Sequence, residues 1–149
     1  MNISIIYESK HGNGKEAMTY LRDVLQKKGF SVQLTSVHEV DPRSPPEADV
    51  YVFSAPNRFG SVIRSMRKFL EKLEMRNPKA RYLVVNTFFG NPAESKGLSQ
   101  MEKILEQKTM TKISNGLMLQ VMSLKGPLET GYQKKLDEFA QQIQSSSGT

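Results

Sequence analysis

The sequence contains no cysteine and no tryptophan, and only two of its 149 residues are histidines. The absence of cysteine excludes disulfides, iron–sulfur ligation, thiolate catalysis and zinc sites built on thiolates. The two histidines, His11 and His38, are too few for a multi-histidine metal site. Redox chemistry would therefore have to come from an organic cofactor, and stacking on that cofactor would have to use phenylalanine or tyrosine.

The sequence also lacks any stretch that approaches the ~20 consecutive apolar residues of a membrane-spanning helix. Its first six residues, MNISII, have no basic region and no small-residue cleavage site, which favours a first strand over a signal peptide. We therefore expect a cytoplasmic protein with no membrane span. A length of 149 residues, with 38% hydrophobic and 24% charged residues, is typical of one soluble domain, expected to cover residues 1–149.

Positive charge is concentrated in one part of the chain. The formal net charge is +6, and the segment 58–81 holds eight cations against only Glu71 and Glu74, so it carries the whole excess. The cations are Arg58, Arg64, Arg67, Lys68, Lys72, Arg76, Lys79 and Arg81. Two interpretations are open: a solvated helix face, or a docking surface for an acidic protein or an anionic substrate. A nucleic-acid partner is not expected, because no known motif or aromatic interleaving supports one.

Apolar runs alternate with amphipathic stretches, the pattern of βα repeats and a parallel sheet. The run 49–55 is almost continuously apolar, like a strand buried on both faces, whereas 30–34 alternates like an edge strand. Ser99 and Glu102 are spaced as a capping box at the start of a helix. We predict strands at about 2–7, 30–34, 49–55, 81–86 and 116–122, helices at about 14–28, 61–75, from 99 and after 130, and a frayed tail at 145–149.

In an open parallel sheet, ligands bind beyond the carboxyl ends of the strands. The loops after the first, third and fourth predicted strands are therefore candidates for a site. The first loop, ESKHGNGK, joins a strand to a helix N-terminus, where unpaired N–H groups and the helix dipole favour an anion. Side chains suited to hydrogen-bond or attract phosphate, and glycines that let the backbone wrap closely, are Ser9, Lys10, Gly12, Asn13, Gly14 and Lys15.

Three other interpretations of this loop are possible. An ordinary glycine-rich turn would have Asn13 as the N-cap and Glu16 at N3. A P-loop fails at two positions of its pattern. The run Gly12-x-Gly14-x-x-Ala17 fits the dinucleotide-binding pattern, with Glu39 near the distance of a ribose-binding acid, but that pattern should follow its strand almost at once. Here residues 8–11 intervene, which suits a loop that cups a terminal monophosphate.

The second loop, SAPNRFG, follows the third predicted strand. Pro56 and Gly60 are expected to shape it. Arg58 and Phe59 have no packing reason to be adjacent at a strand end, but a planar ring could be held there by stacking and cation–π contacts. Asn57 could donate a hydrogen bond to the edge of such a ring.

The third loop, NTFFGNPAE, places Thr87 at a strand end and Gly90 at a turn. Phe88 and Phe89 cannot both point into the core of an alternating element, so one of them is expected to lie against the cofactor ring. The alternative for Phe88 is packing beneath the third helix.

These three loops resemble those of flavodoxin-like proteins. The first is similar to the flavodoxin phosphate loop, usually Ser/Thr-x-Thr-Gly-Asn-Thr, with His11 and Gly14 in place of two hydroxyl residues. The second is similar to the Pro-Thr-Arg-Phe-Gly…Met-Arg-x-Phe-Leu run of NAD(P)H:quinone oxidoreductases of the tryptophan-repressor-binding-protein type, with Asn57 in place of Thr. The third looks like the flavodoxin strand-four loop.

The resemblance implies an α/β flavodoxin-like three-layer sandwich with a five-stranded parallel sheet in the order 2-1-3-4-5. It also implies an FMN cofactor and no metal. The FMN-binding residues that it implies are Ser9, Lys10, His11, Gly12, Asn13, Gly14, Pro56, Asn57, Arg58, Phe59, Gly60, Thr87, Phe88, Phe89 and Gly90.

Three functions remain open at this stage. The first is an FMN-dependent carrier that passes electrons between protein partners; since typical flavodoxins are acidic and this chain is basic, its partner would have an acidic surface. The second is a small NAD(P)H-dependent FMN quinone reductase, favoured by the second loop but not by the length, because such reductases carry extra segments. The third is a flavodoxin-like binding domain that has lost its flavin. No residue is expected to act as a covalent nucleophile.

Overall fold

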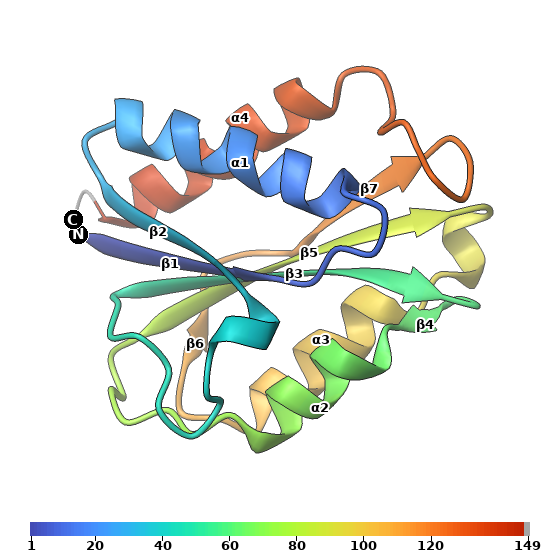
Figure 1. Cartoon of the computed structure of the whole chain (residues 1–149). Coiled ribbons are helices and arrows are strands. Elements are labelled where there is room, and N and C mark those ends of the chain that lie inside the picture. Colours follow the sequence, from blue (N-terminus) through green and yellow to red (C-terminus); the bar gives the residue numbers. More distant parts are fainter. Residues whose placement is uncertain (148–149) are drawn as a thin grey trace.

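A sheet of mainly parallel strands separates two pairs of helices in the computed structural model, which describes residues 1–147 (Figure 1). Helices α1 (Asn13–Lys27) and α4 (Tyr132–Ser147) cover one face. Helices α2 (Arg64–Lys72) and α3 (Gly97–Glu106) cover the other. This is the predicted three-layer α/β arrangement.

Five parallel strands form the body of the sheet. They follow the spatial order β2-β1-β3-β5-β7, which is the predicted order 2-1-3-4-5. Their bounds are β1 Asn2–Tyr7, β2 Ser31–Ser36, β3 Val50–Arg58, β5 Arg81–Phe89 and β7 Leu117–Val121. The central strands β3 and β5 are almost entirely buried, and β2 is the half-exposed edge, as their sequences predict.

Residues 1–147 form seven strands rather than five. Strand β4 (Ser61–Val62) pairs antiparallel with the end of β3. The outer neighbour of β5 is split into β6 (Thr111–Lys112), which pairs with the start of β5, and β7, which pairs with its end. Between them lies Gly116, where a Cβ would come within 2.8 Å of the Val84 carbonyl oxygen, so the chain passes so close to β5 that a side chain would clash.

Several predicted boundaries were wrong. Strands β3 and β5 continue three residues beyond their predicted ends, through much of the two loops that follow them. Helix α2 begins at Arg64 instead of residue 61, because the chain first turns back at Phe59 and Gly60 to form β4. Helix α4 extends to Ser147, so residues 145–147 are not frayed; residues 148 and 149 lie outside the described residues.

The predicted capping box at Ser99 and Glu102 is also wrong. Helix α3 begins at Gly97 with Lys96 as its N-cap, so Ser99 already lies inside the first turn. The Ser99 hydroxyl donates to the Lys96 carbonyl oxygen (3.1 Å), and Glu102 faces Lys112 at 3.5 Å. Helix capping was thus decided by the path of the preceding loop and not by the local pattern.

The core lies on both faces of the sheet, and strand alternation decides which residues enter which half. Ile3 and Ile5 pack beneath α1 and α4, whereas Ile6 and Phe53 pack beneath α2 and α3. All four side chains are at most 2% exposed. Burial of each such side chain contributes about 1.5–3 kcal/mol, so the helices are fixed against the sheet and the strand ends are fixed with them.

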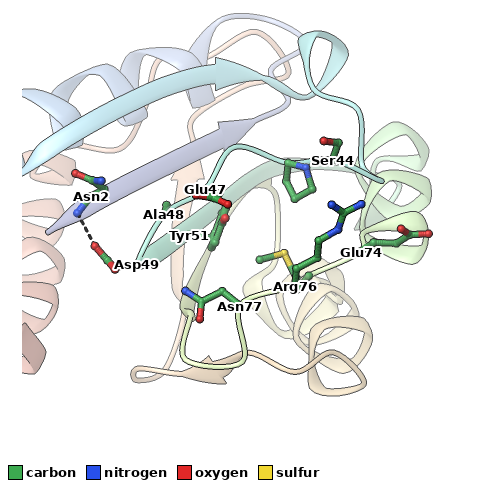
Figure 2. Close-up of a pocket in the computed structure, with 11 residues that line it drawn as sticks. Asn2, Ser44, Glu47, Ala48, Asp49, Tyr51, Glu74, Arg76 and Asn77 are labelled. Carbon is green, nitrogen blue, oxygen red and sulfur yellow. Dashed lines mark hydrogen bonds between the residues drawn. The ribbon is translucent and has the colours of Figure 1, made fainter.

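A hollow of about 430 Å³ lies at the amino ends of the strands (Figure 2). It is bordered by the carboxylates of Glu47, Asp49 and Glu74 and by Arg76, with Tyr51 at its base. Asp49 is occupied structurally, since its Oδ2 accepts the Asn2 backbone N–H at 2.8 Å. Burial raises the pKa of Tyr51, so its phenol stays neutral and donates to the Pro46 carbonyl oxygen. None of the three predicted binding loops lies at this end.

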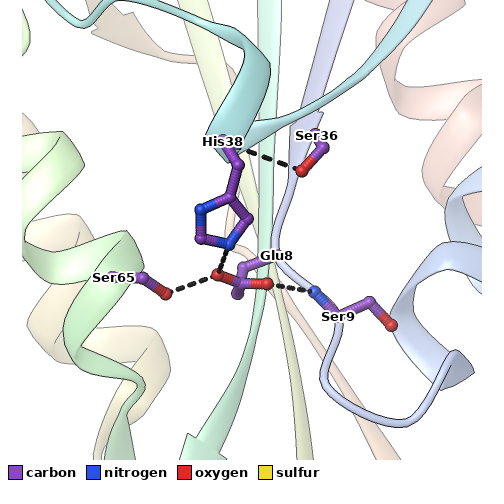
Figure 3. A network of polar contacts seen from close by, with 5 residues as sticks. All are labelled: Glu8, Ser9, Ser36, His38 and Ser65. Carbon is purple, nitrogen blue, oxygen red and sulfur yellow. Dashed lines mark hydrogen bonds and ion pairs between the residues drawn. The ribbon is translucent and has the colours of Figure 1, made fainter.

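The carboxylate of Glu8, just beyond β1, joins three elements at the opposite end (Figure 3). Glu8 is 8% exposed. Its Oε1 accepts the Ser9 backbone N–H (3.0 Å), and its Oε2 accepts the Ser65 hydroxyl of α2 (2.5 Å). The Nε2 of His38, in the short helix η1 (Val37–Glu39), lies 2.6 Å from the same oxygen. One side chain therefore anchors the first loop to both α2 and η1.

A second carboxylate fixes the segment between β7 and α4. The Oε2 of Glu129 accepts the Gln120 backbone N–H (2.7 Å), and its Oε1 lies 2.5 Å from Lys135 Nζ. Burial alone would raise the pKa of Glu129, but the hydrogen bonds from Lys135 and Gln120 and the Lys135 charge outweigh it and lower the pKa below its ordinary value of 4.5.

We expect Glu8→Ala to lower the free energy of unfolding by about 1–3 kcal/mol, because the partly buried Ser9 N–H and Ser65 hydroxyl lose their acceptor. Urea unfolding followed by circular dichroism measures this. Glu39→Ala, which removes an exposed carboxylate from the same η1 helix, is the matched control and should change the free energy by less than about 0.5 kcal/mol. Equal losses in the two variants would contradict the anchoring role of Glu8.

Glu129 should make stability depend on pH. Its folded pKa lies below the unfolded value, so its stabilising contribution is complete above the unfolded value and is lost as the pH falls through the folded one. The difference in free energy of unfolding between the unmodified protein and Glu129→Gln should therefore be largest at pH 6–7. It should shrink steadily as the pH falls below about 4.5, the ordinary value of this group. Urea titrations at pH 7, 5, 4 and 3 test this, and a difference that is independent of pH would refute it.

Candidate functional site

The three predicted loops converge on one hollow of about 410 Å³ at the carboxyl ends of the strands. Its volume lies within the ~300–1,000 Å³ that small-molecule sites usually have. Of the fifteen residues predicted to bind the cofactor, the hollow is lined by all but Gly12 and Gly90: Ser9, Lys10, His11, Asn13, Gly14, Pro56, Asn57, Arg58, Phe59, Gly60, Thr87, Phe88 and Phe89.

The first loop presents a row of free hydrogen-bond donors. No hydrogen bond within residues 1–147 satisfies the backbone N–H groups of residues 10–14, although the next two, of Lys15 and Glu16, are bonded to Ser9 Oγ (3.2 Å) and the Gly12 carbonyl oxygen (2.9 Å). Gly12 has φ of +89° and serves as the N-cap of α1. Unpaired N–H groups at a helix N-terminus form a binding site for an anion.

Asn13 is not the N-cap of α1, so the ordinary-turn interpretation of this loop is wrong in that respect. Asn13 is the first helical residue; the N-cap residue, Gly12, makes no side-chain hydrogen bond, and Ser9 Oγ accepts the Lys15 N–H instead. Its amide lies against Gly126, where a Cβ would come within 2.5 Å of Asn13 Oδ1. The dinucleotide interpretation fails as well, because a Rossmann sheet has the order 3-2-1-4-5-6 and Glu39 is exposed in η1, away from the hollow.

The second loop holds Phe59 almost fully in solvent. Phe59 is 96% exposed, and it is the one residue other than glycine with a positive φ (54°) among residues 1–147. The guanidinium carbon of Arg58 lies 5.6 Å from the centre of its ring, within cation–π distance. The conformation belongs to the turn between β3 and β4, and residues held in this way are common at binding sites.

Beneath Phe59, the loop is fixed by polar contacts. Asn57 Nδ2 donates to Ser95 Oγ (2.6 Å), and its Oδ1 accepts from Asn86 Nδ2 (2.9 Å), which also donates to the Ala55 carbonyl oxygen (3.0 Å). Gly97 lets this amide approach, since a Cβ there would lie 1.8 Å from Asn57 Oδ1. One N–H of the Asn57 amide is left for a ligand.

The third loop is largely the end of β5. Thr87 and Phe88 are buried, at 3% and 6% exposure, and Phe89 is 55% exposed. Alternation along the strand directs the two phenylalanines to opposite faces, yet both contribute to the hollow. Gly90, with φ of +100°, makes the turn, and its carbonyl oxygen accepts from Gln120 Nε2 at 3.0 Å.

Three lining residues were not predicted from the sequence: Ile63, Val121 and Leu124. Ile63 enters the hollow because of β4, which the sequence did not predict. Val121 and Leu124 come from the end of β7 and the loop after it, a fourth loop that the sequence pattern did not indicate. Its apolar residues beside a Gly-Pro pair were the signal that could have directed attention to it.

The residues of the hollow fit a flavin mononucleotide. The donors of residues 10–14, with Lys10 nearby, match a terminal phosphate. Ile63, Phe88 and Leu124 give an apolar wall suited to a flat ring system.

None of the helices in residues 1–147 is long and apolar enough to cross a membrane. The cytoplasmic location stays a prediction.

Known proteins were compared with the chain. No curated protein matches the sequence at a significant level. Among solved structures, a flavodoxin from the domain Archaea has a TM-score of 0.81 at 16% identity, over 100% of both chains. Flavodoxin 2 from Bacillus cereus has a TM-score of 0.82 at 16% identity, over 98% of this chain and 99% of that one.

A larger protein also contains this fold. The rubredoxin oxygen:oxidoreductase of Desulfovibrio gigas has a TM-score of 0.77 at 12% identity, over 97% of this chain and 35% of that one. The present chain therefore spans about a third of that protein's length. At these identities, the likeness to solved structures shows the fold alone.

A sequence model of a family gives the more specific result. The model described as a flavodoxin domain matches residues 4–144, which include all three loops of the hollow and the helices and strands from most of β1 to most of α4. The chain belongs to the flavodoxin domain family, whose cofactor is FMN.

Proposed function

We propose that this protein binds FMN in the carboxyl-end hollow and carries electrons between protein partners. The observation that carries this proposal is the coincidence, in one hollow, of unpaired backbone donors at 10–14 and a fully exposed aromatic ring at Phe59. The first suits a phosphate and the second suits a planar ring, and FMN contains both. When bound, FMN supplies the electron transfer, and the chain supplies position and environment.

Different residues of the hollow bind the phosphate and the ring system of FMN. The N–H groups of residues 10–14 hold the phosphate, and Lys10 adds a positive charge. Phe59 and Phe89 contact the ring system by stacking, while the remaining Asn57 N–H donates to its edge. Ser9 contributes less than the flavodoxin pattern suggests, because its Oγ already accepts the Lys15 N–H.

A carrier is favoured over a reductase by the extent of the match. The chain aligns over nearly its whole length with the archaeal and Bacillus cereus flavodoxins and over nearly all of theirs. A small NAD(P)H-dependent quinone reductase is the second candidate, supported by the Pro56–Gly60 loop. A binding domain without flavin is the third, supported by the two hydroxyl side chains that His11 and Gly14 replace.

The purified protein should show flavin absorbance that survives desalting after FMN is added. A variant with Lys10→Ala, Asn13→Ala and Phe59→Ala should bind FMN about a hundredfold more weakly, because it loses a phosphate cation and a stacking ring, each contributing ~1.4 kcal/mol or tenfold. Fluorescence titration of FMN measures this. Lys79→Ala with Asn115→Ala, at exposed positions outside the hollow, is the control and should bind normally. A protein that stays colourless with excess FMN would refute the proposal and leave the binding-domain alternative.

A carrier should not turn over NAD(P)H by itself. We expect the FMN-loaded protein to oxidise NADH and NADPH no faster than an equal concentration of free FMN, with or without a quinone. The chemically reduced protein should nevertheless pass electrons to ferric cytochrome c. Stopped-flow absorbance at the flavin and haem bands measures both. Rapid NAD(P)H-dependent quinone reduction by the protein alone would show that the reductase alternative is right.

A further inference from the structure

Exposed apolar side chains gather around the mouth of the hollow. Within residues 1–147, the large hydrophobic residues exposed to solvent are Met1, Phe59, Phe89, Met122 and Leu124. Three of the five line the hollow, and Met122 follows directly on the lining residue Val121. Scattered exposed hydrophobics need no explanation, but a cluster on one edge marks an interaction site.

Met122 and Leu124 lie in the loop that follows β7, whose path Figure 1 shows. The Met122 N–H donates to the Pro127 carbonyl oxygen (2.8 Å), and Val121 forms an antiparallel bridge with Leu128. The loop is thus folded back on its strand, and its two apolar side chains remain 59% and 72% exposed. Backbone hydrogen bonds that hold apolar groups in water favour a role in contact with another molecule.

Cations frame these apolar groups. Lys125 is the next residue after Leu124, and the Lys96 N–H donates to the Gly60 carbonyl oxygen (2.7 Å), beside Phe59. Within residues 1–147, no ion pair involves Lys96, Lys125 or Arg58. We name as the rim surface the residues Arg58, Phe89, Lys96, Met122, Leu124 and Lys125. Glu94, whose carbonyl oxygen lies close to Gly60, is an acid beside this surface; set against the three cations of the surface, it leaves a net charge of +2.

Helix α2 extends this positive field. Its exposed residues Arg64, Arg67, Lys68 and Lys72 recur at helical spacing opposite the buried stripe of Met66, Phe69 and Leu70. Glu71 is the one acid among them, and in the described chain no carboxylate lies within 4 Å of any of the four cations. The helix begins directly after β4, at the same end of the sheet as the rim surface (Figure 1).

We propose that the rim surface is the docking site for a redox protein whose own surface is acidic around an apolar centre. This inference rests on the proposed FMN-binding function and names its partner class. The cations would steer an acidic partner, and the apolar side chains would exclude water at the mouth of the hollow. In the step served, one electron leaves the reduced flavin and reduces one metal centre of the partner, as in ferric to ferrous haem, with no atom transferred.

Native cytochrome c and succinylated cytochrome c are the probes, because succinylation reverses the charge of the lysine-rich surface and retains the haem protein. The reduced FMN-loaded protein should transfer electrons to the succinylated form at least about tenfold faster than to the native form at 10 mM ionic strength. This preference should disappear near 0.5 M salt, where charges are screened beyond a few ångströms. Stopped-flow absorbance measures the rates, and calorimetry measures binding without relying on electron transfer.

Matched charge reversals locate the surface. Lys96→Glu with Lys125→Glu should slow transfer to succinylated cytochrome c about tenfold and weaken binding similarly. Lys27→Glu with Lys79→Glu makes the same change in net charge at exposed positions near the amino ends of the strands, and should alter either quantity less than about twofold. The two pairs lie outside the hollow, so their flavin spectra should be unchanged.

Two results would overturn the proposal. One is faster electron transfer to native than to succinylated cytochrome c. The other is an equal loss of rate and affinity in the two double variants, because net charge alone would then explain the preference for the succinylated form. A colourless protein is a separate outcome, because it refutes FMN binding. The calorimetric comparison of the two pairs would still decide whether the rim surface binds an acidic protein.

Discussion

The pairing of β3 with β5 places the parts of the site next to one another. The two strands run side by side through seven residue pairs, from Val50 opposite Arg81 to Pro56 opposite Thr87. Because the register continues to the strand ends, the second and third loops leave the sheet as neighbours. The pairing of Tyr7 with Ser54 brings in the first loop in the same way. A one-residue slip in either register would exchange the buried and exposed faces, so the hydrophobic alternation that builds the core also aligns the site.

The residues beneath the hollow are fixed by hydrogen bonds, whereas those at its mouth have almost no partners. Below the hollow, the Asn57 amide is held by Asn86 and Ser95, and the first loop is anchored by Glu8. Above it, Phe59 and the donors of residues 10–14 have almost no partner within the chain. Such a division suits ligand binding, because the ordering of the loops is completed during folding and little of it has to accompany association.

The sequence predicted those parts of the fold that depend on local pattern. The apolar run at Val50–Ala55 is buried on both faces, as predicted, and the three glycine-containing loops do meet at one edge. The features it missed depend on contacts between distant segments. Strand β4 exists because the chain reverses at Phe59, and the start of α3 at Gly97 reflects the close approach of Asn57, forty residues earlier. Leu124 reaches the hollow through a loop folded back by its bond to Pro127. None of these contacts leaves a periodic signal.

The conformation of Phe59 connects the fold to the proposed chemistry. A residue other than glycine in the left-handed region costs of the order of 1 kcal/mol or more, and a bulky aromatic side chain in water forgoes burial as well. The β3–β4 turn imposes this conformation, since Arg58 pairs with Ser61 and leaves only Phe59 and Gly60 to reverse the chain. Folding of the hairpin therefore holds the ring in solvent at the mouth of the hollow before any ligand arrives. A flat cofactor that covered the ring would remove its apolar surface from water. The free energy that the exposed ring costs the unbound protein would then be regained when the cofactor binds.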